Sequence, residues 1–239
     1  ASMQTIINPD DMNAVEAALK LKDATGCKVT VVTMGPPPAA GMLRELMAMG
    51  ADEGVLVSAR EFGGSDTYAT SQILAAALST LGVEKDDIVM CGRQAIDGDT
   101  AQVGPQISEH LGLPVISYAQ KIREVNEAEK YIVVERQYDD RYHVVKAQLP
   151  CLLTALAELN EPRYMTPGGI FDAYKKDITV WGRNDLKDVL DSNLGLKGSP
   201  TQIAKASDKV RKGAGEKVVL DPTASVNYIV DKLTEKHVL

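Results

Sequence analysis

The sequence predicts an α/β protein with a doubly wound, Rossmann-like, mostly parallel sheet, an antiparallel meander at the edge of that sheet, and an extended C-terminal arm. Three observations lead to this prediction. Strand patterns and helix patterns alternate with short connections up to residue 118. From residue 121 onward the strand patterns become longer and alternate in character. Residues 195–215 are rich in Gly, Ser, Thr and Lys, which is typical of a linker.

The first half of the chain repeats a unit of strand, turn and helix. Residues 10–23 carry apolar residues at helical spacing and follow Asn8 and Pro9, with acidic residues in the expected first turn. The strands that follow are short and apolar, and each leads into a segment with helical spacing. We expect strands at residues 28–33, 54–58, 87–91 and 115–118, and further helices at residues 39–49, 68–81 and from Ile107.

The second half predicts a meander and then an irregular region. Residues 149–156 read as a buried strand, and residues 160–169 as a long exposed loop with two prolines, followed by a short helix. A final amphipathic helix is expected at residues 225–236. Antiparallel strands joined by polar turns are expected at residues 121–125, 131–137 and 141–148.

The sequence divides into a domain and an arm. We expect one α/β domain at residues 1–190 and, at residues 191–239, a linker and helix that pack on a partner chain. The chain opens without Met on a loop that leads into the first helix, whereas a doubly wound sheet normally starts with its central strand. We therefore expect a strand and a loop of about 10 or more residues before Ala1.

Composition and charge argue against several classes of protein. At 239 residues, 44% hydrophobic and 25% charged, the chain has the composition of a globular domain with a full core. Its net charge of −7 argues against nucleic acid as the main partner. No apolar run approaches the roughly 20 residues of a membrane span, and no signal peptide is visible, so we expect a protein without membrane insertion that is cytosolic or resident in an organelle matrix. Of these two locations we favour the bacterial cytoplasm.

The cysteines and histidines do not form a recognisable site. Cys27, Cys91 and Cys151 are scattered singly, so neither a disulfide framework nor a CxxC metal site is expected. We expect Cys27 and Cys151 to be buried free thiols. The histidines do not cluster with one another or with cysteines, so no metal site is expected.

The segment from Cys91 to Pro105, CGRQAIDGDTAQVGP, is the strongest candidate for a ligand site. It follows a short buried strand and leads into a helix, and open α/β sheets bind ligands at the carboxyl ends of their strands. Backbone NH groups before and within the first turn of that helix suit a phosphate. The segment is not a Walker loop, because no GlyLysSer or GlyLysThr follows, and it is not the GxGxxG fingerprint.

Several residues of these loops also have a purely structural interpretation. Asp97 and Asp99 could form a catalytic carboxylate pair, but their spacing is more typical of hydrogen bonding or helix capping. Arg93 is either a surface cation or a partner for a phosphate or an electron-rich ring. Met34 marks either a turn or a ligand contact, and the residues at 66–67 favour a helix cap. No Ser-His-Asp or Cys-His arrangement is visible, so any chemistry would belong to a bound cofactor.

Four segments together closely resemble the β subunit of electron transfer flavoprotein. They are NPDD at residues 8–11, TMGP at 33–36, GRQAIDGDTAQVGP at 92–105 and LNEPRY at 159–164. The resemblance runs in register over essentially the whole chain. It implies a Rossmann-like core and a heterodimer in which the C-terminal arm embraces an α subunit. Family members begin with a strand and a Lys-Gln-Val-Pro loop, which agrees with the expectation of a missing first strand.

The resemblance also implies which residues hold an adenine nucleotide. Met34 departs from the Cys found in some relatives, at a position that makes a backbone or packing contact. The implied cofactor-binding residues are Asn8, Pro9, Asp10, Asp11, Met34, Gly92, Arg93, Gln94, Ala95, Ile96, Asp97, Gly98, Asp99, Thr100, Ala101, Gln102 and Val103.

The second half of the loop separates two branches of the family. The housekeeping branch holds a structural AMP and has a bulkier loop, whereas the electron-bifurcating branch holds a second FAD and has a loop like DGDTAQVGP at residues 97–105 here. Gly98 and Ala101 leave room and free backbone NH groups for a pyrophosphate. We therefore expect FAD, reduced by NADH within the αβ complex. One electron would pass to the α-subunit FAD and an acyl-CoA dehydrogenase, and the other to ferredoxin or flavodoxin.

The segment at 159–164 matches the family's docking loop, in which Leu159 inserts into a pocket of the dehydrogenase. From the residues alone it is either a featureless loop or a docking loop, because an exposed Leu159 is expected beside a basic and an aromatic residue. A nucleotide-binding module of the universal-stress or ATP-pyrophosphatase type is a different interpretation, and it predicts ATP binding by the isolated chain. The implied docking residues are Leu159, Asn160, Glu161, Pro162, Arg163 and Tyr164.

Overall fold

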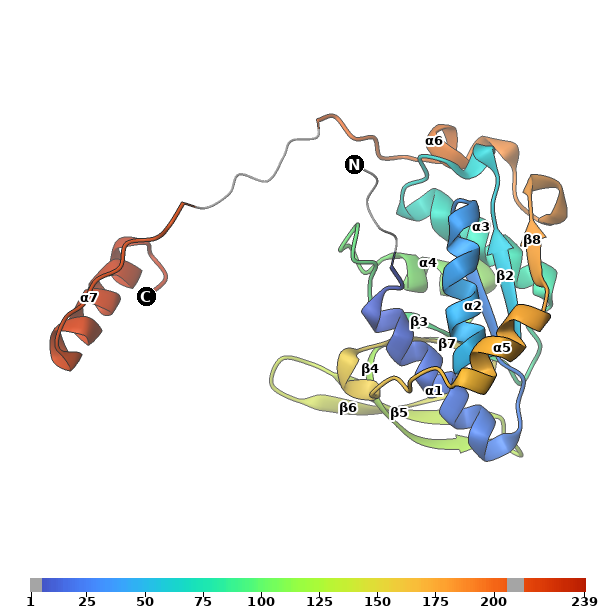
Figure 1. The fold of residues 1–239 in the computed structure, drawn as a ribbon, viewed down its shortest axis with the longest axis horizontal. Coiled ribbons are helices and arrows are strands. Elements are labelled where there is room, and N and C mark those ends of the chain that lie inside the picture. The colour runs from blue at the N-terminus through green and yellow to red at the C-terminus, as the bar shows by residue number, and fades with distance from the viewer. Residues whose placement is uncertain (1–5, 206–212) are drawn as a thin grey trace. The chain divides into compact units, whose positions relative to one another are not determined.

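The computed structural model describes residues 6–205 and 213–239, and Figure 1 shows the course of the chain. The chain divides into two compact units, with the division between Gln202 and Ile203. Residues 191–201, which the sequence assigned to the arm, belong to the first unit. Leu194 is buried in a cluster with Phe62, and Ser199 is buried beside the start of a helix.

The first unit alternates strands and helices in the order that the sequence predicts, up to its fourth strand. Its helices are α1 (Pro9–Thr25), α2 (Ala40–Met49), α3 (Thr67–Leu81), α4 (Val103–Leu111), α5 (Pro167–Lys175) and α6 (Gly195–Gly198). Its strands are β1 (Thr30–Met34), β2 (Glu53–Val57), β3 (Ile88–Gly92), β4 (Val115–Asn126), β5 (Tyr131–Gln137), β6 (Tyr142–Gln148), β7 (Cys151–Ala155) and β8 (Ile178–Trp181). Short 3₁₀ turns cover Pro37–Ala39, Arg60–Phe62, Ala157–Leu159, Arg183–Asp185 and Asp191–Asn193.

The strands form two open sheets. The first has the order β1-β2-β8, and all its neighbours are parallel. The second has the order β3-β7-β4-β5-β6, in which β7 is parallel to β3 and β4 while β5 is antiparallel to β4 and β6. The mostly parallel α/β fold and its antiparallel meander are thus confirmed. The sequence predicted one sheet rather than two, and it did not predict β8.

The three-stranded sheet has helices on both faces, and β2 shows how. Successive side chains of a strand point to opposite faces. Leu56 packs in a cluster with residues of α1, α2 and α5, whereas Val55 and Val57 pack with Phe62 and residues of α3. Figure 1 shows α2 and α5 side by side over this sheet, where they contact each other. Burial on both faces explains why β2 reads as an uninterrupted apolar run.

Helix α1 begins and ends at residues that suit a helix boundary. Pro9 occupies the first turn, where its missing NH costs nothing, and Asp10 and Asp11 favour the positive end of the helix dipole. Gly26, with φ of 76°, ends the helix in the left-handed conformation. Helix α3 begins after Asp66, whose carboxylate accepts a hydrogen bond from the backbone NH of Ala69 at 3.0 Å. The capping interpretation of Asp66 is therefore confirmed.

The two cysteines expected to be buried differ. Cys151, at the start of the fully buried strand β7, is buried, as predicted. Cys27 is exposed, so the prediction of a buried thiol was wrong. Cys27 follows Gly26 directly, and β1 does not begin until Thr30, so this position lies in the connection and outside the sheet.

The second unit contains helix α7 (Pro222–Glu235), which was expected at residues 225–236. Its N-cap, Asp221, accepts hydrogen bonds from the backbone NH groups of Thr223 and Ala224. No residue of α7 is buried in the described structure. Apolar side chains of this helix such as Val226 and Ile229 are exposed.

Candidate cofactor site

The candidate site is built at the carboxyl end of β3. The strand ends at Gly92, which is buried, and residues 95–100 that follow are exposed. The backbone NH of Arg93 donates to the carbonyl oxygen of Ala155 at 2.9 Å, which ties the start of the loop to the end of the neighbouring strand β7. We call residues 93–102 the cofactor loop. Its exposed part lies where open α/β sheets bind their ligands.

The first turn of α1 packs directly on this loop. A Cβ atom at Gly92 would lie 2.7 Å from the Cβ of Asp10 and 2.7 Å from the backbone N of Asp11, so only glycine fits here. The NH of Gly92 donates to the Asp11 carboxylate. The Asn8 amide donates to the carbonyl oxygen of Gln94 at 2.7 Å and to Asp11 at 3.1 Å. The structure therefore brings the predicted residues 8–11 together with the start of the cofactor loop.

Three helices begin beside the cofactor loop. Helix α1 packs closely on Gly92. Helix α4 packs equally closely on the neighbouring Cys91, because a Cβ at Gly104 would lie 2.8 Å from the Sγ of Cys91. Helix α3 is joined to the loop through Thr67, whose hydroxyl donates to Oε1 of Gln102 at 3.0 Å. The first-turn NH groups of a helix lack partners within that helix, and its dipole favours an anion there. This arrangement suits a phosphate group.

Three buried polar side-chain atoms of the described residues lack a hydrogen-bond partner: Asn8 Oδ1, Arg93 Nε and Gln106 Oε1. The first two belong to the predicted site, and the third lies in the first turn of α4, next to the loop. Buried polar groups in proteins are normally paired. Asn8 and Gln106 present acceptors and Arg93 presents a donor, so a ligand with both hydroxyl or amino groups and phosphate oxygens fits these residues. A nucleotide has this combination.

The charges at this site are mixed. Arg93 lies 3.5 Å from the Asp10 carboxylate, which is longer than a direct hydrogen bond and leaves its Nε available. Burial raises the pKa of Asp11, although the hydrogen bond from Gly92 acts in the opposite direction. Burial also raises the pKa of the Cys91 thiol to about 12. Cys91 therefore stays protonated at neutral pH and is not a nucleophile.

The two acids of the loop have different environments. Asp97 is exposed, whereas the Asp99 carboxylate accepts a hydrogen bond from the Gln94 amide, and the Asp99 NH donates to the carbonyl oxygen of Ala95 at 3.0 Å. Neither acid caps α4, because the N-cap of that helix is Gln102 and makes no side-chain cap bond. Asp99 thus shapes the loop by hydrogen bonding, which was one of the two structural interpretations.

The predicted residue Met34 lies on the other sheet. It ends β1 at the carboxyl edge and packs, half-buried, against a cluster that includes Val57 and Phe62. The hydrogen bonds of the described residues do not include one between Met34 and the cofactor loop.

The sequence placed Thr67 in a helix cap and outside the site, and it did not single out Gln106; in the structure Asp66 is the cap and Thr67 is the first residue of α3. The link of Thr67 to the site depends on its hydrogen bond to Gln102, which lies 35 residues further along the chain. Gln106 has no feature in the sequence that would mark it as a site residue.

The predicted docking loop lies against the middle of α1. The Arg163 guanidinium forms a bidentate ion pair with the Glu16 carboxylate at 2.9 and 3.0 Å and a further pair with Asp23 at 2.7 Å. Asn160 donates to the carbonyl oxygen of Asn13. Tyr164 is 95% exposed. Arg163 therefore anchors the loop, and Tyr164 is left free at its surface.

Leu159 is half-buried, which corrects the expectation of an exposed side chain. It ends the 3₁₀ turn Ala157–Leu159, and its NH donates to the carbonyl oxygen of Leu156 at 3.1 Å. This turn follows the buried strand β7 directly and contacts both α1 and β4. The turn thus places part of the Leu159 side chain against the domain.

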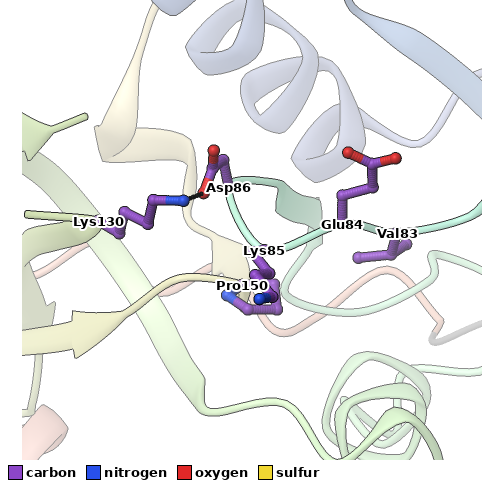
Figure 2. A pocket seen from close by; sticks show the side chains of 6 residues that line it. All are labelled: Val83, Glu84, Lys85, Asp86, Lys130 and Pro150. Carbon is purple, nitrogen blue, oxygen red and sulfur yellow. Dashed lines mark ion pairs between the residues drawn. The ribbon is translucent and has the colours of Figure 1, made fainter. Parts of the chain in front are cut away.

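A pocket of about 510 Å³ lies at the other end of β3, and Figure 2 shows the side chains that line it. Lys130 and Asp86 face each other there and form an ion pair at 2.6 Å. Residues 83–86 of the pocket lining precede β3, whereas the cofactor loop follows it, so the pocket and the candidate site lie at opposite ends of the strand. The pocket is lined by Val83, Glu84, Lys85, Asp86, Lys130 and Pro150, none of which is a predicted site residue.

Comparison with known proteins identifies the family. Residues 1–186 match the electron transfer flavoprotein domain. The chain belongs to the electron transfer flavoprotein family. This match includes the first turn of α1, the cofactor loop and the docking loop. Members of this family associate with a flavin or a nucleotide, and the role of the chain is electron transfer.

Curated relatives of this chain match it over nearly its whole length. It is 52% identical to the acryloyl-CoA reductase electron transfer subunit gamma of Anaerotignum propionicum, over 100% of this chain and 90% of the relative. It is 51% identical to the electron transfer flavoprotein subunit beta of Clostridium acetobutylicum, over 98% and 87%. It is 50% identical to the caffeyl-CoA reductase-Etf complex subunit CarD of Acetobacterium woodii, over 98% and 88%.

The described residues also define what this electron transfer flavoprotein chain lacks. None of its described helices has both the length and the apolar character needed to cross a membrane. Within residues 6–205 and 213–239 no group of three or more His, Cys, Asp or Glu side chains is placed to hold a metal ion.

Proposed function

We propose that this chain is the β subunit of a heterodimeric electron transfer flavoprotein of the electron-bifurcating type, and that the cofactor loop holds FAD. The observation that carries the proposal is the pair of buried atoms without a hydrogen-bond partner, Asn8 Oδ1 and Arg93 Nε, beside the first turns of α1 and α4. The loop sequence DGDTAQVGP at residues 97–105 supports FAD over AMP.

Each group of the site has a task in holding this cofactor. The Arg93 guanidinium and the free backbone NH groups would meet phosphate oxygens, while Asn8 Oδ1 and the loop carboxylates would accept from hydroxyl or amino groups. Thr67 holds Oε1 of Gln102, which directs the amide NH₂ of Gln102 away from α3 and leaves it free to donate to the ligand. FAD in this position supplies the hydride and single-electron chemistry that the protein side chains lack.

We further propose that NADH is the reductant, and that electrons pass both to the α-subunit FAD with an acyl-CoA dehydrogenase and to ferredoxin or flavodoxin. Two relatives are named for an acryloyl-CoA reductase and a caffeyl-CoA reductase-Etf complex, which supports a CoA-thioester enzyme as one partner. The exposed Tyr164 and the anchored loop that carries it support docking at residues 159–164.

The cofactor content of the complex with its α subunit tests this proposal. Two FAD molecules per heterodimer, together with rapid flavin reduction by NADH, are expected. One FAD and one AMP without reduction by NADH would assign the chain to the housekeeping branch. ATP binding by the isolated chain, with no flavin in the complex, would overturn the flavoprotein proposal.

Gly98 offers a sharper test of the room in the loop. A Cβ at Gly98 meets no atom within 4 Å in this chain, so Gly98→Ala leaves the folded chain undisturbed. We expect the variant to lose FAD affinity, because the added methyl group enters the space of the ligand, and to keep its melting temperature. Gly41→Ala is the matched control, since a Cβ there also meets nothing. Equal FAD affinity in both variants would show that the ligand does not approach Gly98.

A further inference from the structure

The C-terminal arm leaves the first unit next to the chain that leads into α3. We call residues 195–201 the arm root. The root packs closely on the chain that precedes α3: a Cβ at Gly195 would lie 2.2 Å from the carbonyl oxygen of Glu61, and the NH of Leu196 donates to the carbonyl oxygen of Gly63 at 3.2 Å. The root is therefore fitted to this surface.

Asp66 joins the arm root to the first turn of α3. Its Oδ1 accepts from the NH of Ala69 and caps the helix, while its Oδ2 accepts from both the NH and the hydroxyl of Thr201, at 3.0 and 2.6 Å. Its own NH donates to the hydroxyl of Ser199 at 2.8 Å, and Ser199 is buried. One aspartate thus accepts bonds from two segments that are 135 residues apart.

The ionisation of Asp66 fits this role. Its partial burial opposes the charged form, but the hydrogen bonds from Thr201, Ala69 and Tyr68 outweigh burial, and the pKa of Asp66 lies below its usual value. Asp66 is therefore charged at neutral pH, and hydrogen bonds to a charged acceptor are stronger than neutral ones.

The next residue in the chain reaches the cofactor loop. Thr67, the first residue of α3, donates from its hydroxyl to Oε1 of Gln102. The arm root, Asp66, Thr67 and Gln102 therefore form a continuous path of one covalent step and two side-chain hydrogen bonds. If Thr201 moves away from Asp66, the Asp66 carboxylate loses hydrogen bonds that hold it at the first turn of α3. Thr67 lies in that turn, so its hydrogen bond to Gln102 is affected as well.

We propose that the arm root and the cofactor loop are energetically coupled through the first turn of α3, with Asp66 and Thr67 as positioning residues. The inference rests on the proposed function, because it takes the cofactor loop to be the nucleotide site. Engagement of the arm by a partner then adjusts cofactor affinity. Coupling between two sites is reciprocal, so the bound cofactor stabilises the arm root by the same factor.

The test uses the complex with the α subunit, stripped of nucleotide and titrated with FAD and, in parallel, with AMP. Thr201→Val removes the hydroxyl donor and keeps the side-chain shape. We expect it to weaken nucleotide binding about fivefold although Thr201 lies outside the loop. Thr67→Val should do the same and Thr67→Ser should restore binding. Hydrogen exchange in peptides covering residues 195–201 should slow when nucleotide binds to the wild type, and should not change in Thr67→Val.

Thr166→Val is the control for the general effect of altering a helix cap, because the Thr166 hydroxyl caps α5 within the first unit by accepting from the NH of Gly169 at 3.0 Å, and the hydrogen bonds of the described residues do not join it to the cofactor loop. It should bind nucleotide like the wild type. Wild-type affinity in Thr201→Val, with arm-root exchange insensitive to nucleotide, overturns the coupling and leaves the proposed function intact. Failure of the wild-type complex to bind either FAD or AMP overturns the proposed function itself.

Discussion

The cofactor loop and the docking loop at residues 159–164 both contact α1, but they are stabilised in opposite ways. The docking loop is fixed by the chain itself, since Arg163 satisfies Glu16, whose side chain is only 4% exposed. The cofactor loop is exposed at residues 95–100, and at its start Asn8 and Arg93 each keep a buried polar atom without a hydrogen-bond partner. In the proposed function, the docking loop is therefore complete before it meets a partner, whereas the cofactor loop is completed by its ligand.

This difference has a physical basis. A docking surface must hold one shape so that little conformational entropy is lost on association. A ligand site gains affinity from groups that find partners only when the ligand is bound, because unpaired buried groups are costly in the free protein. The following predictions are ordered from the largest expected effect to the smallest.

Arg163→Ala should destabilise the first unit most. The buried Glu16 carboxylate would lose its bidentate partner, and breaking a largely buried pair costs about 3 kcal/mol of unfolding free energy. Urea unfolding measures the loss. Arg141→Ala is the control, because its pair with Asp140 is exposed on both sides and is worth less than about 1 kcal/mol. Equal costs for the two variants would contradict an internal role for Arg163.

Leu159→Ala should separate docking from cofactor binding. Removing the exposed part of this side chain should slow electron transfer to the dehydrogenase about tenfold, in the range of a docking hot spot. The cofactor content of the complex should stay the same, because the backbone hydrogen bond from Arg93 to Ala155 that ties the cofactor loop to β7 does not involve the Leu159 side chain. Leu190→Ala, at a side chain that is 68% exposed outside this loop, serves as control. Unchanged transfer in Leu159→Ala would remove the docking assignment.

Asp11 should make stability fall as pH rises. Burial raises its folded pKa, so its contribution is complete below the unfolded pKa and is lost as pH rises through the folded pKa. The unfolding free energy of the wild type minus that of Asp11→Asn should therefore decrease from about pH 4 upward, by about 1.4 kcal/mol per pKa unit of the shift. Urea titrations at several pH values measure this difference.

Asp52 provides the control of opposite sign. Although burial opposes its charge, the hydrogen bonds from Lys22 and the NH of Val29 lower its pKa. Its contribution is present above the unfolded pKa and is lost as pH falls through the folded pKa. The same difference measured for Asp52→Asn should fall on acidification. A common slope for both variants would contradict the distinct environments of the two acids.

The smallest effect is expected at the backbone of the cofactor loop. Ala101 has φ of 54°, a left-handed conformation that costs a residue with a side chain about 1 kcal/mol. Ala101→Gly should therefore be neutral or stabilising by up to about 1 kcal/mol. Ala95→Gly, in the same exposed loop without a positive φ, should be destabilising by a similar amount. Thermal unfolding distinguishes the two, and a loss of stability in Ala101→Gly would exclude strain at this position.

Much of the fold and the centre of the site could be predicted from the sequence. Apolar spacing predicted each strand and helix up to β4 and the meander, and the caps at Pro9 and Asp66 were correctly placed. The position of Gly92 at a strand end also located the cofactor loop. These features depend on residues close together in the chain, where periodicity and capping act.

Other features depended on distant contacts. Strand β8 has only four residues and is recognised by its pairing with β2. The exposure of Cys27 follows from where β1 begins, and the partial burial of Leu159 follows from the turn after β7. At none of these positions does the local sequence differ enough from that of an ordinary loop to predict the observed structure.

The sequence by itself determined the α/β fold, the family and the loop that follows β3, because each of these is written in local patterns. The tertiary structure alone decided that Arg163 is paired with Glu16, 147 residues away, and that Asp66 holds Thr201, 135 residues away. A charged side chain looks the same in sequence whether it faces solvent or a buried partner. Only folding brings that partner within hydrogen-bond distance, and the energy of the interaction depends on the burial that results.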